Sequence, residues 1–220
     1  MELSLVQIAH IETPFPEKFG VPRQSGLCEH IRGRIVFEPE FRDVNSLRFL
    51  ETYSHVWLIW GFSAVFGREW SPTVRPPKMG GNERAGVFAT RSPFRPNPLA
   101  ISCVKLESIE HCEDGPVINV SGVDMVNGTP IYDIKPYVPY TDCVPGALPG
   151  ISSDPQKCSA EVVFECEIDK DLKEVLEEVL GQDPHPLYIN DSSRIYKMSF
   201  KEFTVSFKAC NGRITVTEVR

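Results

Sequence analysis

The chain has 220 residues, of which 41% are hydrophobic and 24% are charged, and its formal net charge is −7. These proportions are those of a globular protein that can bury a core without a disulfide or a metal to stabilise it. The longest apolar run, residues 56–62, is too short to span a bilayer. The acidic start of the chain lacks the basic segment of a secretion signal. We therefore expect a cytoplasmic protein without a membrane segment.

Cysteines and histidines, the usual ligands of a structural metal, are scattered along the chain. There are seven cysteines and five histidines. No two cysteines have the Cys-x-x-Cys spacing of a zinc or redox site, and no two histidines have a metal-binding spacing. The sequence therefore predicts reduced thiols and no metal site.

Short β-type runs dominate the first half of the chain. We expect strands at residues 3–11, 31–37, 56–60, 87–89 and 101–106, and a short helix at residues 46–52. Prolines cluster at residues 72–98 and 130–155, where they favour rigid, extended loops. Strands at this spacing, without long helices between them, predict a mainly β, barrel-like N-terminal domain over residues 1–150.

A different pattern follows a predicted linker at residues 140–157. A strand at 160–168 leads to Asp169, which is a suitable helix N-cap. Apolar residues then recur at helical spacing up to Gly181. The tail predicts a hairpin, in which two alternating strands flank an Asn-Gly turn at 211–212. Residues 158–220 are therefore expected to form a small α+β C-terminal domain.

Charge is distributed unevenly. Residues 68–95 and residues 194–220 each contain six basic side chains and two acidic ones, whereas residues 161–178 contain eight acidic and two basic ones. An acidic protein can still bind phosphate through such local basic segments. The alternative is that these charges only solvate the surface.

Two loops that contain proline carry side chains that suit an anion or a nucleobase. In Val-Pro-Arg-Gln-Ser-Gly at 21–26, backbone N–H groups together with Arg23 and Gln24 can hold a carboxylate or a phosphate. In Arg-Ser-Pro-Phe-Arg-Pro-Asn-Pro at 91–98, three prolines fix the backbone around two arginines and an asparagine. Arginine suits bidentate anion contacts, and asparagine can contact a base edge. The alternative for both loops is a rigid surface turn.

Two later stretches complete the polar set. Residues 122–137 include an Asn-Gly turn and then Asp133 and Lys135, which fall on one face of an extended segment. The alternative for that pair is a structural salt bridge. The last stretch, Asp-Pro-His-Pro-Leu-Tyr at 183–188, is followed by aromatic and basic residues. It suits either contact with RNA or a rigid connection.

In this order along the chain, the four stretches resemble the TsaA/TrmO-like family. The motif at 91–98 is highly specific, and the match extends over nearly the whole chain. The resemblance implies a β-barrel N-terminal domain, a small α+β C-terminal domain and a homodimer. It also implies an S-adenosyl-L-methionine-dependent tRNA methyltransferase, which methylates N6 of threonylcarbamoyladenosine next to the anticodon of threonine tRNA.

The resemblance further implies which residues surround the methyl donor. They are Pro22, Arg23, Gln24, Ser63, Ala64, Arg91, Ile101, Asn127, Gly128, Thr129 and Pro130. Where this chain has Ser63-Ala64, the family usually has a larger polar pair, and His185 replaces a more familiar arginine. We assign Arg95, Asn97 and Lys135 to the RNA substrate.

The residues agree with this chemistry without the family name. S-adenosyl-L-methionine offers a carboxylate, an adenine and a sulfonium cation, for which Arg23 or Arg91, the backbone of the 127–128 turn and aromatic faces are suitable partners. The absence of a Gly-x-Gly-x-x-Gly motif between a strand and a helix argues against a doubly wound methyltransferase. The target nitrogen must be aligned and must lose a proton, and Asp133, Tyr132 or Tyr137 are candidate acceptors.

Two other functions stay open at this point. One is a methyltransferase of the same fold that acts on a small molecule, which the net charge of −7 favours. The other is a non-catalytic RNA-binding module, in which the proline-fixed arginines bind phosphates.

Overall fold

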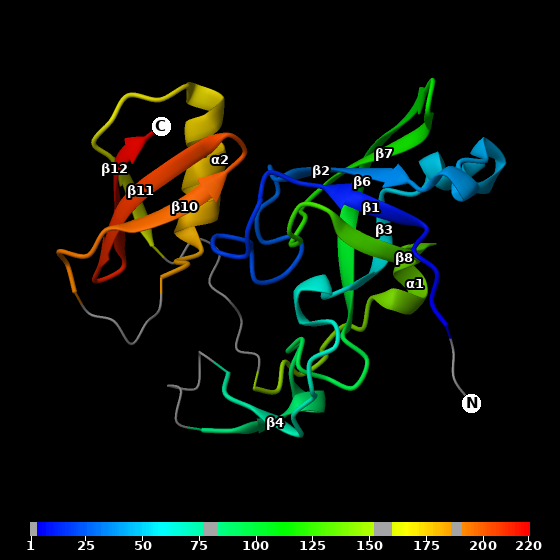
Figure 1. Cartoon of the computed structure of the whole chain (residues 1–220), viewed down its shortest axis with the longest axis horizontal. Helices are drawn as coiled ribbons and strands as arrows, with labels where there is room; N and C mark the ends of the chain where they lie inside the picture. Colours follow the sequence, from blue (N-terminus) through cyan, green and yellow to red (C-terminus); the bar gives the residue numbers. More distant parts are fainter. Residues whose placement is uncertain (1–3, 77–82, 152–159, 186–190) are drawn as a thin grey trace.

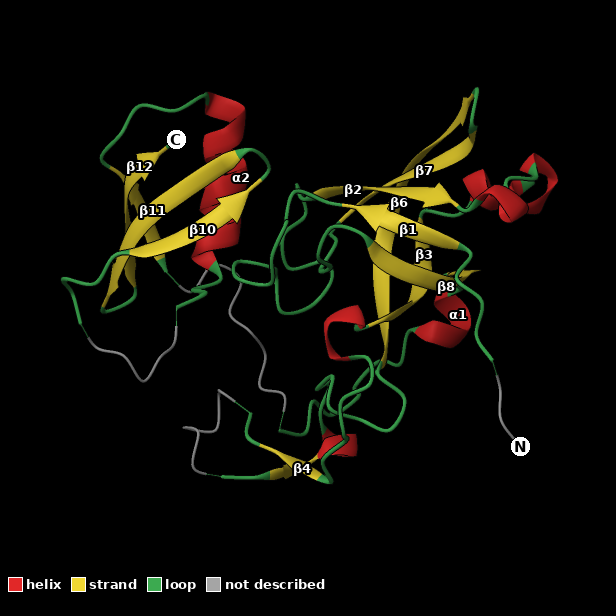
Figure 2. Ribbon diagram, viewed as in Figure 1, coloured by secondary structure: helices red, strands yellow, loops and turns green. Residues whose placement is uncertain are grey.

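Six strands close into a barrel in the first part of the chain (Figures 1 and 2). The computed structural model describes residues 4–76, 83–151, 160–185 and 191–220. Around the barrel the order is β1-β2-β7-β6-β3-β8, and each neighbouring pair is antiparallel. The strands are β1 (Ala9–Glu12), β2 (Arg32–Phe37), β3 (His55–Gly61), β6 (Leu99–Cys112), β7 (Gly115–Ser121) and β8 (Thr129–Pro136). The predicted mainly β, barrel-like body is confirmed.

Alternation along the strands decides which side chains fill the barrel. In β3, Val56, Leu58 and Trp60 are buried in the core, whereas the residues between them point outward and are only partly buried. Successive side chains of a strand face opposite sides, so this period of two gives the barrel wall an inner and an outer face. Ile118 of β7 and Ile131 of β8 belong to the same core.

Because the barrel strands are antiparallel, three long connections leave the barrel at one end. These are residues 13–31 after β1, residues 62–98 after β3 and residues 122–128 after β7. We call this end the loop mouth. Three of the four stretches that the sequence singled out lie wholly or partly in these connections. The barrel therefore gathers residues that are far apart in the sequence.

Several local predictions were wrong in detail. The first strand begins at Ala9, and Leu5 and Val6 stay exposed. Residues 87–89 form a 3₁₀ turn, closed by Thr90, whose backbone N–H and hydroxyl both donate to the Val87 carbonyl oxygen. The expected helix at 46–52 is two 3₁₀ turns, because Phe49 between them adopts a left-handed backbone with φ of 67°.

Smaller elements surround the barrel. Among the described residues, the 3₁₀ turns are Pro39–Phe41, Val44–Leu47, Leu50–Thr52, Ser63–Val65 and Val87–Ala89. A two-stranded ribbon of β4 (Thr73–Val74) and β5 (Ala85–Gly86) lies within the 62–98 connection. The predicted linker starts as a short helix, α1 (Pro139–Asp142), and residues 152–157 of it lie outside the described part.

Residues 160–220, here called the C-terminal module, form a four-stranded sheet and one helix. The sheet order is β10-β11-β12-β9, and β9 runs parallel to β12. The elements are β9 (Glu161–Phe164), α2 (Lys170–Gly181), β10 (Tyr196–Phe200), β11 (Phe203–Cys210) and β12 (Arg213–Val219). Asp169 caps α2 as predicted, because its side chain accepts from the backbone N–H groups of Asp171 and Leu172.

The C-terminal module packs beside the barrel through the 13–31 connection (Figure 1). The Glu178 carboxylate of α2 accepts from the backbone N–H groups of Glu29 and His30, at 2.6 and 2.9 Å. The rings of Phe15 and Phe200 meet edge to face, with centroids 5.5 Å apart. A shared apolar core and charge-assisted hydrogen bonds therefore join the two parts.

None of the helices in the described residues has the length and apolarity needed to cross a bilayer. The six cysteines that the structure describes form no disulfide with one another. No group of three or more histidine, cysteine, aspartate or glutamate side chains in these same ranges is arranged to hold a metal ion.

Candidate active site

The structure joins the first two predicted loops by side-chain contacts. The Arg91 guanidinium donates to the Gln24 amide oxygen, and the Gln24 amide nitrogen donates to the carbonyl oxygen of Arg23. Pro22 is buried beneath them, whereas the Arg23 and Arg91 residues are exposed. The two loops therefore present cationic and amide groups together at the loop mouth, as an anion site needs.

The third stretch reaches the same place through two glycines. The Gly26 N–H donates to the Gly122 carbonyl oxygen at 2.9 Å. A side-chain carbon on Gly122 would lie 3.3 Å from the Gly26 backbone, and both residues have a positive φ, 76° for Gly26 and 77° for Gly122. Glycine at these positions lets the 20–26 and 122–128 segments pack backbone against backbone.

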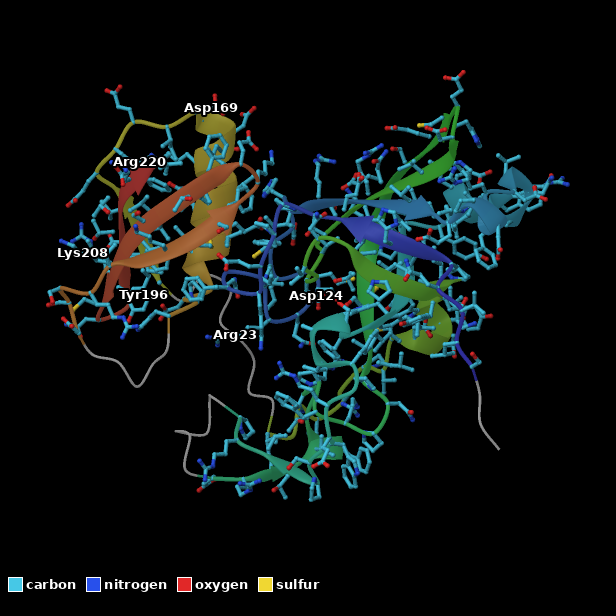
Figure 3. The ribbon with its side chains drawn as sticks, viewed as in Figure 1. Arg23, Asp124, Asp169, Tyr196, Lys208 and Arg220 are labelled. Atoms are coloured by element: carbon cyan, nitrogen blue, oxygen red, sulfur yellow. The ribbon has the colours of Figure 1, made fainter. Side chains whose placement is uncertain are left out.

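The fourth stretch also meets the first. Arg23 donates to the carbonyl oxygen of Asp183 at 3.1 Å. The Asp183 carboxylate contacts the His185 ring, whose centroid lies 6.0 Å from that of Tyr196. Arg23 and Asp124 both lie between the barrel strands and the C-terminal module (Figure 3). Residues 186–188 of this stretch lie outside the described part.

Asp124 is the residue that the sequence reasoning missed. The Ser102 hydroxyl donates to Asp124 Oδ1 at 2.6 Å, and the Trp60 indole N–H donates to the Ser102 oxygen at 2.9 Å. Burial raises the pKa of Asp124 from its ordinary 3.8 to about 6. Hydrogen bonds from Ser102 and from the backbone of Asp124 and Ser25, and then the charge of Arg91, lower this pKa and partly offset burial.

The backbone N–H groups of the Asn127-Gly128 turn, which were expected to contact the donor, are hydrogen-bonded within the protein. They donate to the carbonyl oxygens of Phe15 and Ile11, each at 2.8 Å, and the Asn127 side chain accepts from the Thr13 N–H at 3.0 Å. Thr129 and Pro130, which follow, are buried in the barrel wall. These N–H groups hold the turn against the end of β1, so they are not available for an adenine.

The other predicted donor residues lie around the loop mouth or outside it. Ser63 and Ala64 are exposed in a 3₁₀ turn, and the preceding Phe62 N–H donates to the Pro98 carbonyl oxygen at 2.9 Å. Ile101 is 45% exposed and points away from the core, on the side of β6 opposite to Ser102. The structure therefore does not bring Ile101 to Gln24 and Arg91 within one chain.

Two of the three proposed proton acceptors, Asp133 and Tyr137, are separated from this cluster. Asp133 and Lys135 lie on the outer face of the barrel wall and form a salt bridge with 2.8 Å between Lys135 Nζ and Asp133 Oδ2. Tyr137 lies beyond the far end of β8, against His55 and Trp57. Burial raises the pKa of Tyr132, whose ring packs against Gly61. The salt-bridge alternative for Asp133 and Lys135 is what the structure contains.

Arg95 is held by its own loop. Its guanidinium donates to the Thr90 carbonyl oxygen at 3.1 Å and lies over the Phe88 ring, 6.0 Å from the centroid. A hollow of about 320 Å³ opens beside it, between Pro93 and Arg68. Asn97 is exposed. This part of the loop is thus a preorganised polar surface next to the Gln24–Arg91 contact.

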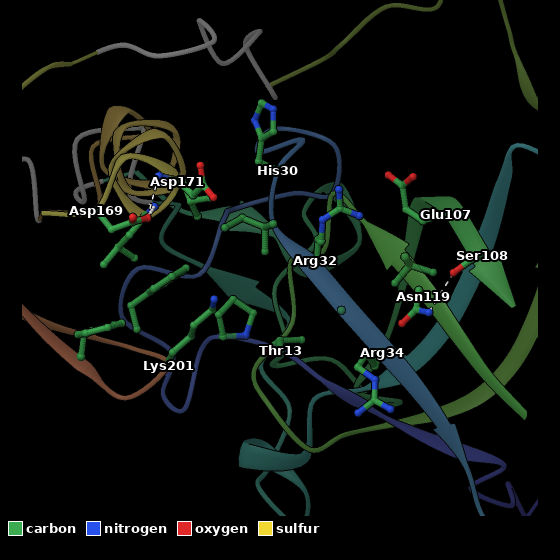
Figure 4. A pocket seen from close by; sticks show the side chains of 18 of the residues that line it. Thr13, His30, Arg32, Arg34, Glu107, Ser108, Asn119, Asp169, Asp171 and Lys201 are labelled. Atoms are coloured by element: carbon green, nitrogen blue, oxygen red, sulfur yellow. Dashed lines mark hydrogen bonds between the residues drawn. The ribbon is translucent and has the colours of Figure 1, made fainter. Parts of the chain in front are cut away.

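A separate cleft of about 890 Å³ lies between the barrel and the C-terminal module. Arg32 and Arg34 extend from β2 on one side, Asp169 and Asp171 lie at the start of α2, and Lys201 lies in the β10–β11 turn (Figure 4). Arg34 is paired with Glu12. Both signs of charge line this cleft, so it is a less specific anion site than the loop mouth.

Comparison with known proteins places the chain in a family. The tRNA-methyltransferase O N-terminal domain matches residues 10–143, and the TrmO C-terminal domain matches residues 156–220. The Escherichia coli (strain K12) protein named tRNA (adenine(37)-N6)-methyltransferase is 35% identical, with 96% of this chain and 94% of that protein covered. The protein of the same name from Eikenella corrodens is 40% identical over 76% of this chain and 97% of its own length.

Solved structures agree with the sequence matches. The crystal structure of TrmO from Pseudomonas aeruginosa superimposes with a TM-score of 0.80 at 32% identity, and all of each chain is covered. A second Pseudomonas aeruginosa TrmO structure gives a TM-score of 0.81. Sequence, domain order and fold therefore lead to the same conclusion. This chain belongs to the TrmO family.

Proposed function

We propose that the chain is an S-adenosyl-L-methionine-dependent tRNA methyltransferase, which methylates N6 of threonylcarbamoyladenosine next to the anticodon of threonine tRNA. The observation that carries this proposal is the meeting of Gln24, Arg91 and Asp124 at the loop mouth of a TrmO-family chain. These residues come from three connections of the barrel. A surface that only solvated the protein would not need to assemble them.

The chemistry of this cluster fits the methyl donor. The donor supplies a methyl group bound to a positively charged sulfur, together with an amino-acid carboxylate and an ammonium group. Arg91 and the Gln24 amide suit the carboxylate. Because Arg91 and Gln24 already contact each other, they are oriented before a ligand arrives, which lowers the ordering cost of binding.

The division of labour follows the two parts of the chain. Residues 1–150 bind the donor and carry out the reaction, and residues 158–220 contribute to tRNA contact. Arg194 lies over the Tyr196 ring, with its guanidinium carbon 5.2 Å from the centroid, a pairing that leaves an exposed cation near the Arg23–Asp183 contact. With a net charge of −7, the protein relies on such local basic groups in the cytoplasm.

A homodimer completes the proposal. Exposed aromatic side chains gather in the 62–98 connection: Phe66, Trp70, Phe88 and Phe94 are 47%, 49%, 72% and 40% exposed. Exposed aromatic clusters of this kind favour a protein interface. Sedimentation at micromolar concentration is expected to give twice the mass of one chain. A Trp70→Glu/Phe88→Glu double variant is expected to give a single-chain mass.

The experiment that tests the function is methyl incorporation into individual transfer RNAs, followed by mass spectrometry of the nucleosides. Threonine tRNA that carries threonylcarbamoyladenosine is expected to gain one methyl group, and other transfer RNAs are not. Donor binding without transfer to any RNA would favour a small-molecule substrate. Absence of donor binding in calorimetry would favour a non-catalytic RNA-binding protein.

A further inference from the structure

Asp124 lies at the loop mouth, but the family resemblance gave it no role. We propose that Asp124 is the group that accepts the proton lost by the target nitrogen, and that Ser102 and Trp60 are positioning residues that hold its carboxylate. This inference rests on the proposed function. It assigns a residue to a proton transfer that the reaction requires.

The geometry around Asp124 is directional. The Trp60 N–H donates to the Ser102 oxygen, so the hydroxyl hydrogen is left to point at Asp124 Oδ1, 2.6 Å away. Trp60 and Ser102 are 7% and 1% exposed and belong to two paired strands, β3 and β6. A buried pair on rigid strands therefore fixes one carboxylate oxygen. Here Asp124 is the base, Ser102 holds it and Trp60 orients Ser102. Enzymes that transfer protons use chains of this kind, in which each group orients the next.

Its neighbours place Asp124 with the donor-binding residues. Asp124 accepts from the Ser25 backbone, Ser25 follows Gln24, and the charge of Arg91 acts on its carboxylate. Among the described residues, Arg91 is the charged side chain that lowers this pKa. Asp133, by comparison, is neutralised by Lys135 on the outer face, and Tyr137 lies beyond the opposite end of β8. Asp124 is thus better placed than Asp133 or Tyr137.

The electrostatic state of Asp124 suits the same task. With a pKa of about 6, the group is mostly ionised at neutral pH, and it is a stronger base than an ordinary aspartate. The new bond joins the target nitrogen to the methyl carbon while the carbon–sulfur bond breaks with its electron pair on sulfur, and the proton of the nitrogen passes to the Asp124 carboxylate. Every charge is then accounted for, because the donor loses its positive charge as the carboxylate becomes neutral.

The first test compares Asp124→Asn with Asp142→Asn in the full-length protein. Asn has nearly the same shape but cannot take a proton, so kcat is expected to fall about 100-fold or more. Donor affinity in calorimetry is expected to stay within about threefold, which also shows that the variant is folded. Asp142, on the outer face beside Trp57, is the matched control, and Asp142→Asn is expected to keep wild-type turnover.

The second test changes Ser102 and measures the carboxylate itself. The hydrogen bond from Ser102 lowers the pKa of Asp124, so Ser102→Ala is expected to raise it. Carbon-13 NMR of the aspartate carboxyls in the ligand-free protein is expected to show this upward shift. The acidic limb of the kcat profile is expected to move to higher pH by the same amount, which a purely structural role for Ser102 would not produce.

Three results would each overturn the assignment of Asp124 and leave the proposed function intact. They are wild-type turnover in Asp124→Asn, donor affinity that falls as far as kcat, and an acidic limb that does not follow the carboxyl titration. The second result would make Asp124 a donor-binding residue instead. If the wild-type protein transfers no methyl group to any tRNA, the proposed function and this inference fail together. Methylation assays of the wild type and the variants side by side distinguish these cases.

Discussion

Two tryptophans of β3 are linked by hydrogen bonds to two aspartates in opposite environments. Trp60 faces the inside of the barrel and reaches Asp124 through Ser102. Trp57 faces the outside, and its indole N–H donates directly to Asp142 Oδ2 at 2.9 Å. Burial raises the pKa of Asp124 to about 6, whereas hydrogen bonds from the backbone of Val138 and from Trp57 lower the pKa of Asp142.

The difference shows that hydrogen bonds alone do not decide the charge of a carboxylate. Both aspartates accept bonds from good donors, and only the exposed one is stabilised as an anion. Desolvation outweighs the donors around Asp124, because the charged form loses water that two or three hydrogen bonds do not replace. The inner aspartate is therefore suited to exchange a proton, and the outer one to fix the start of α1.

The largest effect on the free energy of unfolding is expected when the tryptophans are replaced. Trp60→Phe replaces the buried indole by a smaller ring and removes the N–H that orients Ser102, so the free energy of unfolding is expected to fall by about 2–3 kcal/mol. Trp57→Phe removes a donor at the surface and is expected to cost less. Urea unfolding of both variants at pH 7.5 measures the comparison. Equal losses would mean that the two tryptophan–aspartate contacts are equivalent.

A smaller effect of opposite sign is expected for Asp124→Asn. The folded pKa of about 6 exceeds the ordinary 3.8, so the folded state binds more protons than the unfolded state between these values. Its stability therefore falls as the pH rises from about 4 to above 6. Asn removes this loss, and the variant is expected to be about 1–3 kcal/mol more stable than the wild type at pH 8.

That gain is expected to shrink at pH 4.5, where Asp124 of the wild type is mostly protonated in the fold. Thermal and urea unfolding at the two pH values provide the measurement. A gain that is the same at both pH values would mean that burial of the charge is not its cause. A more stable but slower variant would be a direct case of stability given up for activity.

Asp142→Asn is expected to act in the reverse direction. Its folded pKa is lowered, so its contribution to stability is present above its ordinary pKa of 3.8 and is lost as the pH falls through the lowered value. The variant is thus expected to be less stable than the wild type at pH 7 and indistinguishable from it near pH 2. Circular dichroism during acid unfolding checks this, and a loss that persisted at pH 2 would argue against the ionised contact.

The smallest effect is expected from Arg91→Ala. Among the causes that act on Asp124, the charge of Arg91 comes last, so its removal is expected to raise the Asp124 pKa less than Ser102→Ala does. Carboxyl NMR of the two variants measures both shifts. The same variant is expected to weaken donor binding in calorimetry, because Arg91 also holds Gln24. If the Asp124 pKa rose more in Arg91→Ala than in Ser102→Ala, the charge of Arg91 and not the Ser102 hydrogen bond would be the main effect that opposes burial.

Local signals made part of the fold predictable. Asp169 and the apolar spacing after it fixed the start of α2, and the Asn-Gly turn at 211–212 fixed the final hairpin. Residues 87–89 look like a strand by composition, yet Gly86 and Thr90 bend them into a turn. The strands β7, β8 and β10 were not identified as strands from the sequence. Both partners of β8, which are β1 and β3, lie far away in the chain, whereas β7 and β10 each pair with a neighbouring strand, β6 and β11, across a short turn.

The candidate site was predictable only as a set of loops. Proline and arginine density indicated Arg23 and Arg91, but the contact of Arg91 with Gln24 depends on how the barrel brings two connections together. Asp124 sits between Val123 and Met125, both buried, and so resembles an incidental polar residue in a core segment. The signal that could have identified it is this apolar setting itself, since a carboxylate flanked by core residues is desolvated.

Closure of the barrel has a consequence for the order in which the protein folds. Ala9 pairs with Ile131, so β1 has one of its two neighbours only after most of the first domain has been synthesised. Pairings of such long sequence separation form slowly, because the chain must lose the entropy of the whole intervening loop first. Because β8 pairs with both β1 and β3, this step fixes the 13–31 and 62–98 connections relative to each other. A nascent or truncated chain that ends before β8 therefore contains Arg23 and Arg91 but is not expected to form the site.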